Sequence, residues 1–285
     1  MRRLKKWPSD PLTAFFRLAI LAVLAGGCAS GSRDAGGHRA LEGPAMDLAQ
    51  ELYLRAESLK TLAARGAASY ETEGRRRFFR FEAFVMKPDR LQFTAFDPAG
   101  RPAFRLVAAD GRLEGLIYGA RQYFTGPASP ENLARFLPLN LTLDQLVALL
   151  SGSITRPLAA GARTVGGNTE LVLIPAEFPE DENEIWRLRL SGGLDQPPRQ
   201  AVILSAARGP ANRPNLSLRY PTVRELPRAD APGLMEPFPA SVEAEWPREK
   251  QHLRLTYDEI SLNPPLDPSL FALTSPADFE TVLLP

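Results

Sequence analysis

Hydrophobic and polar residues alternate along much of the chain, in short runs that end at proline or glycine. Trp186, Leu188 and Leu190, for example, alternate with Arg187 and Arg189. A period of two places every second side chain on one face of an extended strand, so these runs predict half-buried β-strands. The expected strands are 78–87, 91–95, 104–108, 113–118, 170–174, 185–190, 201–206, 215–223, 241–246 and 253–260.

Three segments show helical signals instead. Leucines at 48, 52, 59 and 62 have helical spacing and predict an amphipathic helix from Asp47 to Gly66. Ser129-Pro130-Glu131 is typical of a helix start, and Thr142 with Gln145 forms a capping box. The proline-rich ranges 208–213 and 226–239 predict loops.

The apolar faces of these strands must be hidden from water, and a curved sheet hides them best. We therefore expect a mainly β (α+β) fold, an unclosed antiparallel β-barrel of about ten or eleven strands with a helical lid. A chain of 285 residues with 44% hydrophobic content supplies enough apolar material for such a core.

The first residues have the pattern of a secretory signal. A basic start is followed by the apolar run 18–24 and the small residues before Cys28. This ending resembles the lipobox of bacterial lipoproteins, in which the cysteine is acylated, although Ala25 stands at the usual leucine position. The alternative is an incidental cysteine after an ordinary signal. We predict a lipoprotein signal peptide at 1–27, a flexible tether at 28–43 after lipidated Cys28, and a folded domain at 44–285.

The charge of the chain without this leader argues against nucleic-acid binding. The whole chain carries +1, and residues 1–27 contain five basic side chains and one acidic one, or +4. The remainder therefore carries about −3. In the lipoprotein sorting scheme, the absence of aspartate after Cys28 implies the outer membrane, with the domain facing the periplasm.

The residue inventory offers little for catalysis. The two histidines, His38 and His252, fall in the expected tether and in a strand, and no nucleophile elbow is present. The acidic run 181–184 lacks calcium-loop spacing. Nothing points to a specific carboxylate pair for sugar hydrolysis. We expect no catalytic residues, no metal site and no cofactor, and therefore no enzyme.

The interior of the curved sheet leaves two alternatives. A filled interior would suit a structural or scaffold lipoprotein, whereas a cavity lined by apolar side chains would hold a hydrocarbon ligand. The residues expected to line such a lipid-binding cavity are Phe79, Phe81, Leu91, Phe93, Phe104, Leu106, Trp186 and Leu204.

Several motifs occur in the order found in a known family. They are Arg65 to Tyr70, Asp89 to Gly100, Leu137 to Gly152, and the C-terminal set of Tyr257, Asn263, 266–268 and 271–276. The chain resembles the outer-membrane lipoprotein receptor LolB and LolA-like lipoproteins.

The resemblance implies an unclosed barrel whose cavity accepts lipoprotein acyl chains from a periplasmic LolA-like carrier, acting as a monomer without nucleotide hydrolysis. In that family an exposed bulky residue aids membrane insertion; here Ala99 holds this position. The alternatives are an envelope scaffold lipoprotein and a phospholipid- or glycolipid-binding lipoprotein.

Overall fold

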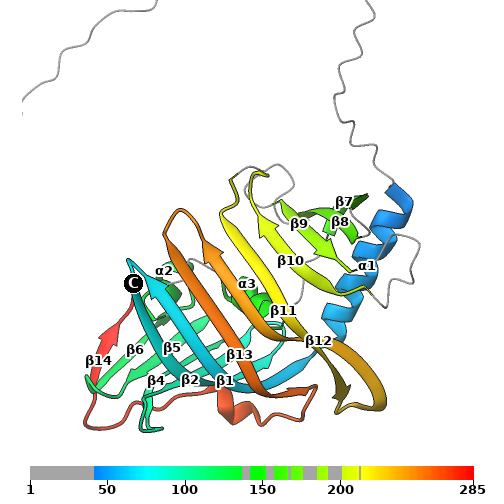
Figure 1. The fold of residues 1–285 in the computed structure, drawn as a ribbon. Helices are drawn as coiled ribbons and strands as arrows, with labels where there is room; N and C mark the ends of the chain where they lie inside the picture. Colours follow the sequence, from blue (N-terminus) through cyan, green and yellow to red (C-terminus); the bar gives the residue numbers. More distant parts are fainter. Residues whose placement is uncertain are drawn as a thin grey trace, which may run out of the picture. The chain divides into compact units, whose positions relative to one another are not determined.

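The computed structural model describes residues 42–136, 142–151, 157–165, 168–175, 185–191, 201–211 and 213–285. These residues form a 14-stranded sheet in the order β14-β6-β5-β4-β3-β2-β1-β13-β12-β11-β10-β9-β8-β7 (Figure 1). Neighbouring strands pair antiparallel, except that β14 runs parallel to β6. Over the described ranges no pairing joins β14 to β7, so the sheet is unclosed, as predicted. The expected signal peptide, Cys28 and the tether up to residue 41 lie outside the described residues.

The strands vary from 4 to 16 residues in length. The strands of the first half are β1 (Thr61–Thr72), β2 (Arg75–Met86), β3 (Arg90–Phe96), β4 (Pro102–Ala109), β5 (Arg112–Ile117), β6 (Gln122–Pro127) and β7 (Pro157–Val165). The remaining strands are β8 (Asn168–Pro175), β9 (Trp186–Leu190), β10 (Ile203–Arg208), β11 (Leu216–Arg228), β12 (Ala231–Trp246), β13 (Gln251–Leu262) and β14 (Glu280–Leu283). The helices are α1 (Glu42–Ser58), α2 (Pro130–Ala134), α3 (Leu143–Ser151) and the short 3₁₀ helix η3 (Pro268–Phe271).

Register keeps the apolar residues of successive strands on one face, here called the inner face. One cross-strand row on this face is Leu171, Leu188, Ala206, Leu218, Ala244, Leu253 and Tyr70. Every member of this row is buried. Because directly paired residues of antiparallel strands share a face, the alternation seen in sequence becomes one continuous core surface.

The strand number is higher than the ten or eleven expected, because four strands lack a clear alternating run. These strands are β1, β6, β7 and β14. The predicted helix from Asp47 to Gly66 is wrong in its second half, since α1 ends at Ser58 and β1 begins at Thr61. Leu62, Ala64, Ala68 and Tyr70 of β1 are buried in a period of two.

Distant side chains end helix α1, which explains why local spacing misplaced its boundary. Arg228 Nη2 and Asn263 Nδ2 donate to the Ser58 carbonyl at 3.1 and 2.9 Å. Lys87 Nζ donates to the Ala56 carbonyl at 2.7 Å. Cationic donors at the last carbonyls stabilise a helix C-terminus. The boundary therefore depends on residues up to 205 positions away.

The predicted loop at 226–239 is also wrong, because these residues belong to the hairpin of β11 and β12. The prolines are tolerated here: Val223 pairs with Pro239, Glu225 pairs with Pro237, and register shifts flank this part of the hairpin on both sides. Proline cannot donate to a ladder, so it suits irregular or edge pairing. Proline content alone therefore does not identify a loop in this region.

The C-terminal segment covers the other face of the sheet at β3 to β5. Gln92, Val107 and Leu116 lie on this outer face and are nevertheless buried, as is Phe271 of η3. The Leu273 amide donates to Glu114 Oε2 at 3.1 Å. The chain then continues into β14, which pairs with β6. This part of the sheet is thus covered on both faces.

Candidate apolar binding site

Phenylalanine rings of β2, β3 and β4 meet on the inner face. Phe81 and Phe93 are stacked with centroids 5.6 Å apart, and Phe93 lies 5.9 Å from Phe104. The register makes room for them, because Phe93 pairs with Ala83 and Phe104 pairs with Ala95. Alternating large and small side chains across neighbouring strands let the rings approach diagonally.

This group extends in both directions along the inner face. Phe136, just after α2, stacks on Phe104 at 6.4 Å and meets Phe124 edge-on at 5.2 Å. Gly115 allows this approach, since a Cβ at Gly115 would lie 2.9 Å from the Phe136 ring. At the other end Tyr257 contacts Phe81 and Phe238.

We call these residues together the aromatic cluster: Phe79, Phe81, Phe93, Phe104, Phe124, Phe136, Phe238 and Tyr257. One end of it is buried and the other is accessible. Phe81, Phe93, Phe238 and Tyr257 have at most 4% exposure. Phe79, Phe104, Phe124 and Phe136 are only partly buried while packing on the same core. An apolar ligand would thus reach the accessible rings first.

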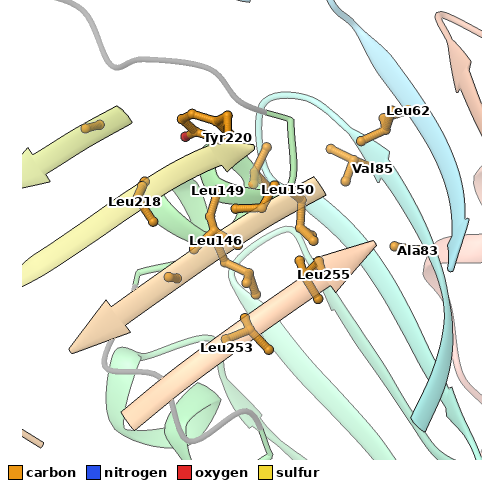
Figure 2. Close-up of a cluster of buried hydrophobic side chains, with 14 of the residues drawn as sticks. Leu62, Ala83, Val85, Leu146, Leu149, Leu150, Leu218, Tyr220, Leu253 and Leu255 are labelled. Carbon is orange, nitrogen blue, oxygen red and sulfur yellow. The ribbon is translucent and has the colours of Figure 1, made fainter. Parts of the chain in front are cut away.

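Helix α3 covers the buried part of the inner face. Leu146, Leu149 and Leu150 pack toward Leu253 and Leu255 of β13 (Figure 2). The predicted capping box is confirmed: the Thr142 amide donates to Gln145 Oε1 and the Gln145 amide to Thr142 Oγ1, both at 3.2 Å. The helix is thus locally stabilised as well as packed on the sheet.

A buried hydrogen bond joins α3 to the sheet beneath it. The Tyr257 hydroxyl donates to the Leu150 carbonyl at 2.7 Å. Burial raises the pKa of this hydroxyl well above its usual range, so Tyr257 stays protonated and remains a donor. The bond satisfies one carbonyl near the C-terminus of α3, which an apolar neighbour would leave unpaired.

Six of the eight residues predicted to line a cavity come together. Phe79, Phe81, Leu91, Phe93, Phe104 and Leu106 share the inner face of β2 to β4. Trp186 also packs on the core, but five strands lie between β2 and its strand β9 in the sheet order. Leu204 lies at a register shift in β10 and is only partly buried. Whether any of these residues binds lipid stays a prediction.

Four members of the aromatic cluster were missed in the sequence. Phe124 belongs to β6, whose short run gave no clear alternation, and Phe238 falls in the range expected to be a loop. Phe136 follows a five-residue helix. Tyr257 alternates visibly in β13, but its position opposite Phe81 depends on pairing with β1. Of these four residues, only Tyr257 could have been found from the sequence, through its alternation in β13.

Ala99 lies at an exposed turn between β3 and β4. The Asp97 carboxylate closes this turn by accepting hydrogen bonds from the backbone amides of Ala99 and Arg101, both at 2.9 Å. Hydrogen bonds from Arg101 and Ala99 lower the pKa of Asp97. The turn is therefore rigidly closed, and its tip offers little apolar area.

Over the described ranges, no three His, Cys, Asp or Glu side chains gather closely enough to hold a metal ion. No helix among the described residues is long and apolar enough to cross a membrane.

Solved structures share this fold at low sequence identity. A DUF1329 family protein from Desulfovibrio piger superposes with a TM-score of 0.56 at 13% identity, over 81% of this chain and 97% of that chain. A LolA superfamily protein from Nitrosomonas europaea gives 0.52 at 12% identity, over 79% and 97%. A Vibrio parahaemolyticus domain assigned to outer-membrane lipoprotein sorting gives 0.52 at 10% identity, over 79% and 95%. The LolA-like fold is thereby confirmed.

Sequence comparisons add no family. No protein-family model matches this chain, and no curated protein does.

Proposed function

We propose that this protein binds acyl chains at the accessible end of the aromatic cluster, as a lipid-anchored acceptor of lipoproteins at the outer membrane. The observation that carries the proposal is the continuity of the partly exposed rings Phe79, Phe104 and Phe136 with the buried rings beneath. The shared fold of the LolA superfamily protein and the lipoprotein-sorting domain supports it.

Acyl transfer of this kind needs no bond-making residue. A hydrocarbon chain moves from the apolar site of a soluble carrier to another apolar site and then into a bilayer, and burial of its surface drives each step. Displacing α3 would extend the accessible surface from Phe79 toward Phe81 and Phe93. We therefore propose a non-enzymatic role in which α3 acts as the lid.

The site is tested with two neighbouring phenylalanines on opposite faces. Phe79 packs on the core, whereas Phe78 is 70% exposed on the outer face. With the full chain in a neutral detergent, Phe79→Asp is expected to weaken binding of a fluorescent fatty acid at least about tenfold, since a carboxylate resists burial against hydrocarbon. Phe78→Asp should leave the affinity unchanged. Equal affinity in both variants would refute the site.

The membrane anchor and the direction of transfer need separate tests. Labelling cells with an alkyne fatty acid should mark the wild-type protein and not Cys28→Ser. Depletion of the protein should shift other lipoproteins out of the outer-membrane fraction if it accepts them from a carrier. An unchanged distribution would exclude the acceptor role while leaving acyl binding in place.

The close packing of the buried rings favours a second candidate, an envelope scaffold lipoprotein with a filled interior. Phe81 and Phe93 stack directly, so no ligand lies between them. Mass spectrometry of lipids extracted from the purified full chain separates the two functions. Co-purified acyl species would favour the acceptor, and a lipid-free protein that captures another envelope protein would favour the scaffold.

A further inference from the structure

A row of polar side chains crosses the outer face of the sheet from β8 to β13. Its members are paired in register, strand by strand: Glu170, Arg189, Ser205, Arg219, Glu243 and Arg254. The row lies on the face opposite to the aromatic cluster, because its members alternate with the buried inner-face residues. It is therefore independent of the proposed acyl site.

On β11 to β13, an acidic side chain of this row lies between two arginines. Glu243 Oε2 lies 3.3 Å from Arg219 Nε, and its other oxygen accepts a hydrogen bond from Arg254. The bond from Arg254 and the charge of both arginines lower the pKa of Glu243. One carboxylate thus serves two guanidinium groups on the neighbouring strands.

On the other side of Arg219 the intervening residue is neutral. Ser205 of β10 lies between Arg189 and Arg219, where the alternation would place an acid. Strands are about 4.8 Å apart, so the two arginine backbones lie roughly 10 Å apart and their long side chains both reach the space above Ser205. An anion at this position would complete the row.

A hollow of about 400 Å³ occupies this place. Its lining includes the small residues Ser205, Ala207 and Ser217 and the arginines Arg187, Arg189 and Arg219. Asn168, Thr169 and Glu170 are its other polar lining residues. One guanidinium nitrogen of Arg187 donates to the Gly209 carbonyl, which fixes the direction of that side chain. Three arginines against one glutamate leave the hollow positively charged.

The adjoining surface has the opposite character. A second hollow of about 240 Å³ shares Ser217 and Arg219 and is lined further by Glu243, Glu245 and His252. Its two carboxylates repel anions, so the positive potential is confined to the part of the face over β9 to β11.

We propose that the hollow above Ser205 binds a phosphate group, either as free phosphate or as the headgroup of a lipid. Guanidinium groups present paired donors that match phosphate oxygens, and the Ser205 and Ser217 hydroxyls add neutral donors. The volume exceeds that of a single carboxylate and admits a phosphate with a small substituent. The apolar residues that line the hollow are Leu188, Ala206, Ala207 and Leu218. Leu188, Ala206 and Leu218 are buried members of the inner face, so we expect a hydrocarbon tail to remain outside the hollow.

The direct test measures stabilisation of the full chain by ligand, because binding to the native state raises the unfolding midpoint. Inorganic phosphate should raise this midpoint for the wild type, in a neutral detergent and at constant ionic strength. The double variant Arg189→Gln/Arg219→Gln should bind at least about tenfold more weakly. The matched control, Arg65→Gln/Arg80→Gln, removes two exposed arginines outside the hollow and should bind as the wild type does. Equal binding by all three proteins, or none by the wild type, would overturn the proposal.

A second variant places an acidic side chain at Ser205, the neutral position between Arg189 and Arg219. Ser205→Glu should bridge Arg189 and Arg219, raise the unfolding midpoint without phosphate and abolish the response to phosphate. Ser205→Gln occupies the same volume without charge and should show no gain in midpoint. If Gln stabilises as much as Glu, charge completion is refuted. Comparing phosphate, glycerol 3-phosphate and glycerol then identifies the source: tighter binding of glycerol 3-phosphate than of phosphate indicates a lipid headgroup, and equal binding indicates free phosphate.

Discussion

The Tyr257 hydroxyl holds the Leu150 carbonyl at 2.7 Å, so one side chain of β13 fastens the end of α3 to the sheet. Both groups are buried, and the donor belongs to the same ring that contacts Phe81. The hydrogen bond that secures α3 and the aromatic cluster therefore share a residue.

Tyr257→Phe removes this bond and leaves the carbonyl unpaired. We expect a loss of about 1–2 kcal/mol in the free energy of unfolding, measured by urea denaturation. If α3 is the lid, the same variant should bind a fluorescent fatty acid more tightly or faster, because opening costs less. Tyr53→Phe, on partly exposed α1, should change stability by less than about 0.5 kcal/mol. Equal effects of the two substitutions would show that the buried bond does not matter.

Gly66 is required where β1 and β13 approach most closely. A Cβ at this position would lie 2.1 Å from the Thr256 carbonyl oxygen, at a register shift between the two strands. Gly66→Ala should therefore cost roughly 3 kcal/mol or more, because the backbone itself must move.

Gly119→Ala is the matched control for this effect. A Cβ at Gly119 would meet nothing within 4 Å, so stability should be unchanged or rise by a few tenths of a kcal/mol. Urea denaturation of both variants decides the matter. A Gly66→Ala protein as stable as Gly119→Ala would mean that the β1–β13 contact relaxes freely.

Because Gly126 has no side chain, the last residues of the chain can pack against β6. A Cβ there would lie 2.6 Å from Leu284 Cβ and 2.8 Å from its carbonyl oxygen. Gly126→Ala should displace β14 and speed hydrogen exchange of the amides at 280–284, while the amides of β1 and β2 keep their protection. Unchanged exchange at 280–284 would show that β14 tolerates the added methyl group.

Acid should weaken the junction between α1 and the β11–β12 hairpin. The Asp230 carboxylate accepts hydrogen bonds from Arg228 Nη2 at 2.7 Å and from Asn263 at 3.0 Å. The bond from Arg228 is the main cause that lowers the pKa of Asp230 to about 2. A lowered pKa means that this stabilisation is complete above the unfolded value near 3.8 and is lost as pH falls toward 2.

The pH dependence is measured by urea denaturation of the wild type and Asp230→Asn. Between pH 4 and pH 2 the wild type should lose stability more steeply, because only it binds a proton at this site on unfolding. Parallel curves over that interval would contradict the assignment.

Alternation was enough to predict ten of the fourteen strands and the inner face that they share, because a buried face leaves a period of two in a strand's own sequence. The failures occur where distant residues decide. The end of α1 depends on Arg228 and Asn263, and the strand character of 231–240 depends on pairing with β11. The aromatic cluster was half predicted: the rings of β2 to β4 alternate visibly, whereas Phe136 and Phe238 reach it only through the three-dimensional fold.

The row over Ser205 shows a further kind of information that one sequence does not display. Arg189, Arg219 and Glu243 look like ordinary exposed positions of separate strands. Their pattern appears only when the register sets them side by side, and Ser205 then stands out as the neutral member of a charged series.

The central pairing of β1 with β13 also limits how early the sheet can form during synthesis. Leu62 pairs with Leu262, which is synthesised 200 positions later. At ribosomal rates of about 5–20 residues per second, β1 waits roughly 10–40 s for its partner. Throughout that interval the nascent β1–β2 hairpin offers an open edge to any other extended chain. Production of this protein should therefore benefit from holdase chaperones that occupy the edge until β13 emerges.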